Sequence, residues 1–138
     1  FQDGIVPVSF ALTAPKNPDK WYIDTANNGG AVSGTGSSMK SGAILGGETN
    51  CVSYTRMGTN DVLFSLKTDS NASNYLMFYV DNNSVGYGSW SGPTAWRRVI
   101  FTMPNLVGTS HTYKWCYEKG SATITGADAV WLDDIEFR

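Results

Sequence analysis

Short runs in which β-branched or aromatic residues alternate with polar residues constrain the fold of this chain most. Such runs lie at residues 62–66, 76–80, 96–101 and 113–117. Clusters of Gly, Asn, Ser and Pro separate the runs, at residues 27–30, 34–38, 69–73, 82–84, 86–94 and 119–126. A period of two is typical of strands, and turns at this spacing are typical of a β-sandwich. The sequence therefore predicts an all-β fold: roughly nine to eleven strands in two packed antiparallel sheets, a jelly roll or a related sandwich.

Composition and charge exclude several classes of protein. The 138 residues fit one domain, expected to span residues 1–138. Aromatic residues make up 13% of the chain, too many for a disordered protein. No apolar run approaches the roughly 20 residues of a membrane helix. No signal-peptide pattern opens the chain, so we expect any leader to have been removed. The net charge of -2 argues against a nucleic-acid partner.

The two cysteines, Cys51 and Cys116, stand too far apart for a CxxC redox or zinc motif. Low charge and abundant Thr, Ser, Asn and Gly are typical of secreted β domains, in which a single disulfide is common. Two interpretations stay open at this point. The cysteines either form one disulfide or remain two isolated, partly buried thiols.

The C-terminal segment 129–137 places acidic residues within a strand-like pattern. Alternation puts Trp131, Ile135 and Phe137 on one face, and Asp133 would point into the core with them. A buried carboxylate costs several kcal/mol unless it is paired or binds a cation. One solution is a hard cation with oxygen ligands, for which Asp3 is a candidate second ligand. The alternative is that Asp133 accepts hydrogen bonds from backbone amides or a buried Thr.

Aromatic residues on loops are candidates for binding sugars, because their rings stack on the C–H faces of a pyranose. Trp90 lies in the Gly- and Ser-rich segment 86–93, and Tyr87 lies two residues before it. We expect Trp90 to be exposed on this loop, with Tyr87 sharing its face. The alternative is that Trp90 anchors the loop by folding back over the sheet edge.

Four further residues are candidate partners for a sugar. Tyr79 and Asn82 flank a predicted turn, while Trp96 and Arg98 lie in the next strand-like run. Tyr79 also ends an aromatic stripe over residues 75–79. If the stripe faces solvent, it lines a cleft; if it faces inward, it belongs to the core. The sequence leaves that choice open.

Catalytic motifs are absent from the sequence. The three glutamates, Glu48, Glu118 and Glu136, lie in no recognisable acid–base motif. His111, the one histidine, adjoins Ser110 without a supporting Asp pattern. We therefore predict that this chain is not an enzyme.

The two ends of the chain resemble those of calcium-containing jelly-roll carbohydrate-binding modules. The resemblance rests on the opening Phe1-Gln2-Asp3-Gly4 and the closing Trp131-Leu132-Asp133-Asp134-Ile135-Glu136-Phe137. It implies a structural calcium ion held by Asp3 and Asp133, with Asp134 as a further ligand. Gln2 stands where a Glu is common, so no ligand is carried over there. Segments between the ends, such as His111–Lys119, are similar to bacterial MAM-like and cleaved-adhesin sandwiches.

In these families the module is usually attached to a secreted polysaccharide-degrading enzyme or a surface protein. The expected function is therefore non-catalytic binding of a β-linked plant or algal polysaccharide, such as a β-glucan or xylan. The module would be a secreted monomer, covalently part of a larger glycoside hydrolase that it tethers to its substrate. The alternative is a cell-surface adhesion or protein-interaction domain, which predicts a broad flat patch instead of an aromatic cleft.

Overall fold

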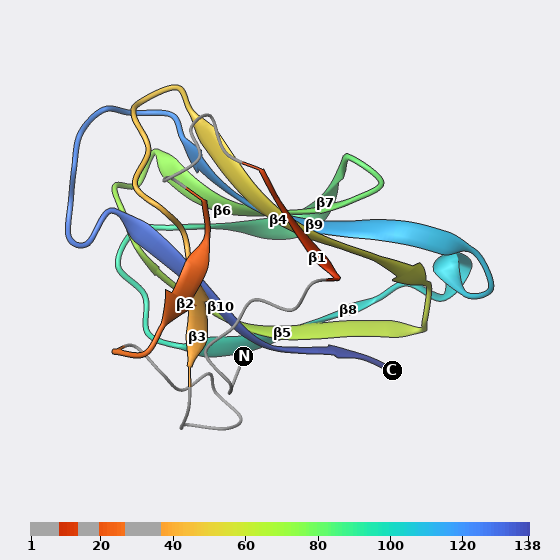
Figure 1. The fold of residues 1–138 in the computed structure, drawn as a ribbon. Coiled ribbons are helices and arrows are strands. Elements are labelled where there is room, and N and C mark those ends of the chain that lie inside the picture. Colours follow the sequence, from red (N-terminus) through yellow and green to blue (C-terminus); the bar gives the residue numbers. More distant parts are fainter. Residues whose placement is uncertain (1–8, 14–19, 27–36) are drawn as a thin grey trace.

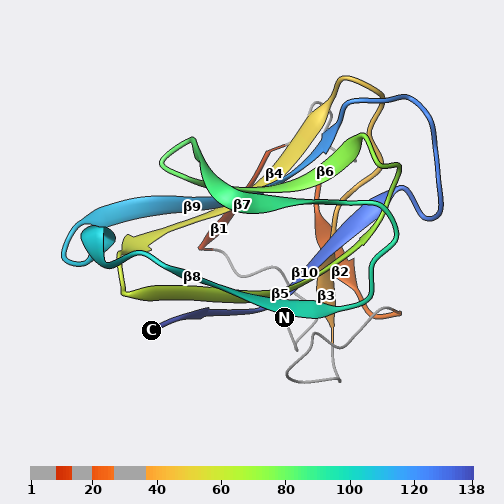
Figure 2. The same ribbon diagram turned by 180° about the vertical axis from the view of Figure 1, so that it is seen from behind.

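A computed structural model describes residues 9–13, 20–26 and 37–138, apart from the side chains of residues 86 and 87. Two five-stranded antiparallel sheets pack face to face (Figures 1 and 2), which confirms the predicted sandwich. Sheet A has the strand order β1 (Phe10–Thr13), β4 (Thr49–Met57), β9 (Ser110–Lys119), β6 (Asn74–Val80) and β7 (Asn83–Ser91). Sheet B has the order β2 (Tyr22–Asp24), β3 (Ser38–Lys40), β10 (Ala129–Phe137), β5 (Asp61–Asp69) and β8 (Arg97–Thr102).

Helical structure among the described residues is confined to one 3-10 turn, Pro104–Leu106, which follows β8. Within the same residues, the structure has no helix of the length and apolar character needed to cross a membrane.

An aromatic cluster fills the space between the sheets. Phe64 on β5 contacts Phe78 on β6 and Trp115 on β9, with ring centroids 5.1 Å and 5.5 Å away. Both contacts have the edge-to-face geometry that aromatic rings favour. Trp21 joins this core and its indole N–H donates to the Asn50 carbonyl at 3.2 Å. Trp21 and Trp115 are thus both core residues.

A bulge in β10 corrects the predicted alternation of the C-terminal strand. Asp133 lies opposite Ser65, whereas Glu136 lies opposite Leu63, so β10 holds one more residue than β5 between these pairs. Asp134 occupies the bulge with a φ of 49°. An extra residue shifts every later side chain to the other face. Leu132 therefore points into the core, as do the later residues Ile135 and Phe137.

Trp131 and Asp133 consequently lie on the outer side of sheet B, not on the core side with Ile135 and Phe137. Both are nevertheless buried, so the predicted burial of the carboxylate is confirmed although its predicted direction is wrong. Trp131 lies between Lys40 and Lys67, whose ammonium groups are 5.3 Å and 4.8 Å from its ring centroid. Its indole N–H donates to Asp24 at 2.8 Å.

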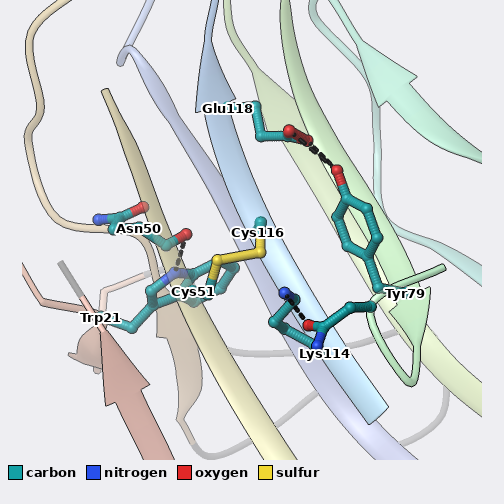
Figure 3. The surroundings of a disulfide bond; sticks show 8 residues. Trp21, Asn50, Cys51, Tyr79, Lys114, Cys116 and Glu118 are labelled. Carbon is teal, nitrogen blue, oxygen red and sulfur yellow. Dashed lines mark hydrogen bonds between the residues drawn. A yellow bond between two sulfur atoms is a disulfide. The ribbon is translucent and has the colours of Figure 1, made fainter. Parts of the chain in front are cut away.

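Of the two interpretations of the cysteines, the structure shows the disulfide, which joins two neighbouring strands of sheet A. Cys51 on β4 and Cys116 on β9 are directly opposite in the register, with Cα atoms 4.1 Å apart. Their neighbours Val52 and Trp115 point into the core, so the disulfide lies on the outer face of the sheet (Figure 3).

Candidate functional site

The outer face of sheet A carries the stripe whose direction the sequence left open. On β6, Leu76 and Phe78 are buried in the core, so Tyr75, Met77 and Tyr79 point away from it. Tyr75 is 39% exposed. The stripe therefore faces solvent.

Residues of β9 complete this surface. The register places Glu118 opposite Tyr75 and Lys114 opposite Tyr79. Directly opposite side chains on one face have Cβ atoms about 4.5–5.5 Å apart. The surface formed by Tyr75, Met77, Tyr79, Lys114 and Glu118 is called the tyrosine face below.

Tyr79 spans the tyrosine face along the strands. Its hydroxyl donates to the Glu118 carboxylate, with oxygen–oxygen distances of 2.6 Å and 2.9 Å (Figure 3). Glu118 stands opposite Tyr75 and not opposite Tyr79, so the Tyr79 ring must lie along the sheet, across the row of Met77 and Cys116. Burial, and then the hydrogen bond and charge of Glu118, raise the pKa of Tyr79 to about 12. The phenol is therefore neutral at physiological pH and holds Glu118 in place.

Lys114 closes the other end of the tyrosine face. Its Nζ atom lies 5.0 Å from the centroid of the Tyr79 ring and donates to Asn82 Oδ1 at 2.7 Å. Asn82 lies in the tight turn between β6 and β7, where its φ of 64° is a conformation that Asn tolerates well. Two predicted sugar-binding residues, Tyr79 and Asn82, are thus brought together through a lysine.

A depression lies beside Tyr75, at the Glu118 end of the tyrosine face. It has a volume of about 410 Å³ and is lined by Ser73, Tyr75, Met77, Ser89, Glu118 and Gly120. Figures 1 and 2 show β4, β6 and β9 bending away from sheet B toward one end, so the outer face is the hollow side of the bend. The face thus combines an exposed aromatic ring, hydroxyl groups, a fixed carboxylate and a cation. Such a set can bind the C–H face and the hydroxyl groups of a sugar.

The prediction that Trp90 is an exposed loop residue is wrong. Trp90 belongs to β7, is only 9% exposed, and packs edge-on against Phe64 and Phe101 in the core. Glycine at 88 lets β7 lie close to β6, because a Cβ there would come within 3.2 Å of the Phe78 Cβ. Trp90 therefore does not offer an exposed ring on which a sugar could stack. The side chain of Tyr87, its predicted companion, lies outside the described residues.

Trp96 and Arg98 belong to the other sheet. Trp96 immediately precedes β8, and Arg98 lies on it, so neither is on the tyrosine face. Arg98 donates to the Asp134 carbonyl at 3.0 Å and to the Glu136 carboxylate at 2.7 Å. These contacts hold the bulge of β10, and the sugar contacts predicted for Trp96 and Arg98 stay predictions.

The acidic residues at the C-terminal bulge form the predicted metal region. Asp133 Oδ1 accepts the backbone N–H of Asp134 at 2.8 Å, and Asp134 Oδ2 accepts the Ser65 hydroxyl at 2.8 Å. Asp3, the predicted second ligand, lies outside the described residues. Within the described ranges, no three His, Cys, Asp or Glu residues gather as a metal centre. Calcium therefore stays a prediction.

His111 has two close partners that the sequence did not indicate. Its Nδ1 contacts Asp81 Oδ2 and its Nε2 contacts Thr109 Oγ1, both at 2.5 Å. Thr109 also donates its hydroxyl proton to the Leu106 carbonyl at 3.3 Å. These contacts tie the β6–β7 turn, which holds Asp81, to the segment before β9, which holds Thr109.

Comparison with known proteins gives similarity at the level of the fold. Neither a protein-family model nor a curated protein sequence matches the chain. Two solved structures match with comparable TM-scores. The secreted serine protease VesC from Vibrio cholerae matches with a TM-score of 0.62 at 17% identity, over 86% of this chain. TmCBM61, solved in complex with β-1,4-galactotriose, matches with a TM-score of 0.63 at 12% identity, over 95% of this chain and 88% of its own.

A third match is the tailspike protein 4 of bacteriophage CBA120, with a TM-score of 0.60 at 11% identity over 97% of this chain. This chain spans only 24% of the protease and 20% of the tailspike. The chain thus has the sandwich fold found in the carbohydrate-binding module TmCBM61. The predicted likeness to MAM-like and cleaved-adhesin domains stays a prediction.

Proposed function

We propose that this chain is a non-catalytic carbohydrate-binding module and that its ligand lies on the tyrosine face. The observation that carries the proposal is the geometry of two tyrosines around one carboxylate. Tyr75 exposes its ring, and Tyr79 lies along the sheet and holds Glu118. A sugar ring on Tyr75 would find an acceptor for its hydroxyls already fixed, which reduces the entropy lost on binding. The fold shared with a module that binds a β-1,4-linked oligosaccharide supports the same conclusion.

The wider setting is part of this proposal. A single disulfide suits an oxidising, extracellular compartment. We propose that the module acts as a secreted monomer and tethers an attached polysaccharide-degrading enzyme to a β-linked plant or algal glycan.

Replacement of Tyr75 by Ala tests the proposed site. Loss of the ring should weaken binding roughly 10- to 100-fold, the effect of removing one buried aromatic contact. Affinity electrophoresis in gels containing neutral galactans, glucans, xylans or mannans, or anionic polyuronates or sulfated galactans, would measure the retention. Tyr22→Ala is the matched control, because Tyr22 is 45% exposed on sheet B. Equal retention of the two variants would contradict the site, and no retention of the wild type on any polymer would favour an adhesion domain.

We also propose that Asp133 and Asp134, with Asp3, hold a structural calcium ion. The donor set consists of oxygen atoms, which suits a hard cation, and Asp133 is a buried carboxylate. A bound ion stabilises the folded state, by about 2.7 kcal/mol when its concentration is 100 times the Kd. Chelation should then lower the Tm by roughly 5–10 °C, and added Ca²⁺ should restore it. An unchanged Tm, together with no divalent ion by elemental analysis, would contradict the metal site.

A further inference from the structure

The charge pattern of the tyrosine face is uneven. Its carboxylate, Glu118, accepts a strong hydrogen bond from Tyr79. Its cation, Lys114, has two weaker partners, the neutral amide oxygen of Asn82 and the face of the Tyr79 ring. Four ion pairs join residues of the described ranges, and Lys114 takes part in none of them. One end of the face is therefore a carboxylate held in place by a hydrogen bond, and the other is a cation without an anionic partner there.

Other cations near the sandwich surface are placed elsewhere. Arg97 and Arg98 lie on β8 of sheet B, where Arg98 is paired with Glu136. Lys40 and Lys67 lie beside Trp131 on the outer side of sheet B. Among the five residues of the tyrosine face, Lys114 is the one cation.

Lys114 also lies against the Tyr79 ring, since its Nζ atom is 5.0 Å from the ring centroid. An oxyanion is a stronger partner than an amide oxygen, because hydrogen bonds between two ionised groups are roughly twice as strong as neutral ones. A negatively charged group beside Asn82 would draw the ammonium off the ring and open Tyr79 for stacking.

We propose that Lys114 determines specificity and that the ligand is an anionic glycan, whose oxyanion substituent pairs with Lys114. This inference rests on the proposed function of the tyrosine face. The substituent is a carboxylate, as in a uronic acid, or a sulfate ester. The neutral part of the glycan then lies over Tyr75, with its hydroxyls toward Glu118. The proposal replaces the β-glucan or xylan expected from the sequence.

Polymer pairs that share a backbone and differ in charge test this proposal. Mannuronan, a β-1,4-linked polyuronate, against its full methyl ester tests the carboxylate, and a sulfated galactan against the desulfated polymer tests the sulfate. We expect the wild type to bind the charged member of one pair about 10-fold more tightly, the value of one charged hydrogen bond. This preference should decrease as NaCl rises from 50 to 500 mM, because salt screens exposed charges.

Variants of Lys114 assign the preference to this side chain. Lys114→Ala should lose the 10-fold preference, and Lys114→Arg should keep most of it. Arg97→Ala removes an exposed cation from sheet B and should leave the preference intact. Equal binding of both members of each pair, with Tyr75→Ala still defective, would overturn the inference and leave the proposed function standing. Absence of binding to every polymer, neutral or charged, would overturn both.

Discussion

Removal of the Cys51–Cys116 disulfide is expected to lower the free energy of unfolding by about 4 kcal/mol. The two cysteines are 65 residues apart, so the crosslink closes a long loop in the unfolded chain. In the chain-entropy description, a closed loop of this length removes enough freedom from the unfolded state to give about 4 kcal/mol. For a domain of this size the Tm should then fall by roughly 10–15 °C.

The measurement is urea unfolding of a Cys51→Ala/Cys116→Ala double variant, followed by tryptophan fluorescence. The slope of the transition should also increase, because an uncrosslinked chain exposes more surface when it unfolds. Wild-type protein under reducing conditions provides a second comparison, since it breaks the same crosslink without changing the sequence. If the free energy of unfolding of the double variant were within about 1 kcal/mol of the wild-type value, the crosslink would not reduce the conformational entropy of the unfolded chain as expected.

The fold could be predicted from the sequence because the strand pattern is local. Alternation over residues 62–66 and 113–117 puts Phe64 and Trp115 in the core, as observed. The same alternation places Cys116, the residue after Trp115, on the outer face of β9. Cys51 is its direct partner in the register. What the sequence could not supply was this register, which depends on how distant strands pair.

The errors have specific physical causes. At β10, one extra residue at Asp134 reverses the alternation, and nothing in the local pattern marks the bulge. At β7, the glycines near Trp90 are typical of a loop, yet at residue 88 the missing side chain allows two strands to approach closely. In each case a contact with a neighbouring strand overrides the local preference.

The candidate site depends on the same cross-strand pairing. The sequence indicated Tyr79 and the stripe over residues 75–79, but not the carboxylate beside them. Side chains alternate along β9, and Trp115 points into the core. Lys114, Cys116 and Glu118 therefore point to the outer face. That signal was present in the sequence, yet its use required knowledge that β6 and β9 are neighbours.

Loss of the Lys119 cation should be the most destabilising single charge change in the described part of the chain. Lys119 is almost fully buried at the end of β9. Its ammonium donates to Asp128 at 2.5 Å and to the Ile44 carbonyl at 3.1 Å. Tyr117 donates to the other oxygen of Asp128 at 2.6 Å, and burial, followed by this contact, raises the pKa of Tyr117. One buried ion pair therefore connects three separate segments.

Lys119→Met is expected to cost about 3–5 kcal/mol, because it leaves the Asp128 carboxylate partly buried without its cation. Adding Asp128→Asn should restore part of the loss, since the amide is neutral and Asn tolerates the φ of 50° at this position. Arg138→Met is the matched control, because the pair of Arg138 with Glu136 is largely exposed. Its urea midpoint should barely move. If Lys119→Met shifted the midpoint no more than Arg138→Met, the buried pair would contribute no more to stability than a surface contact.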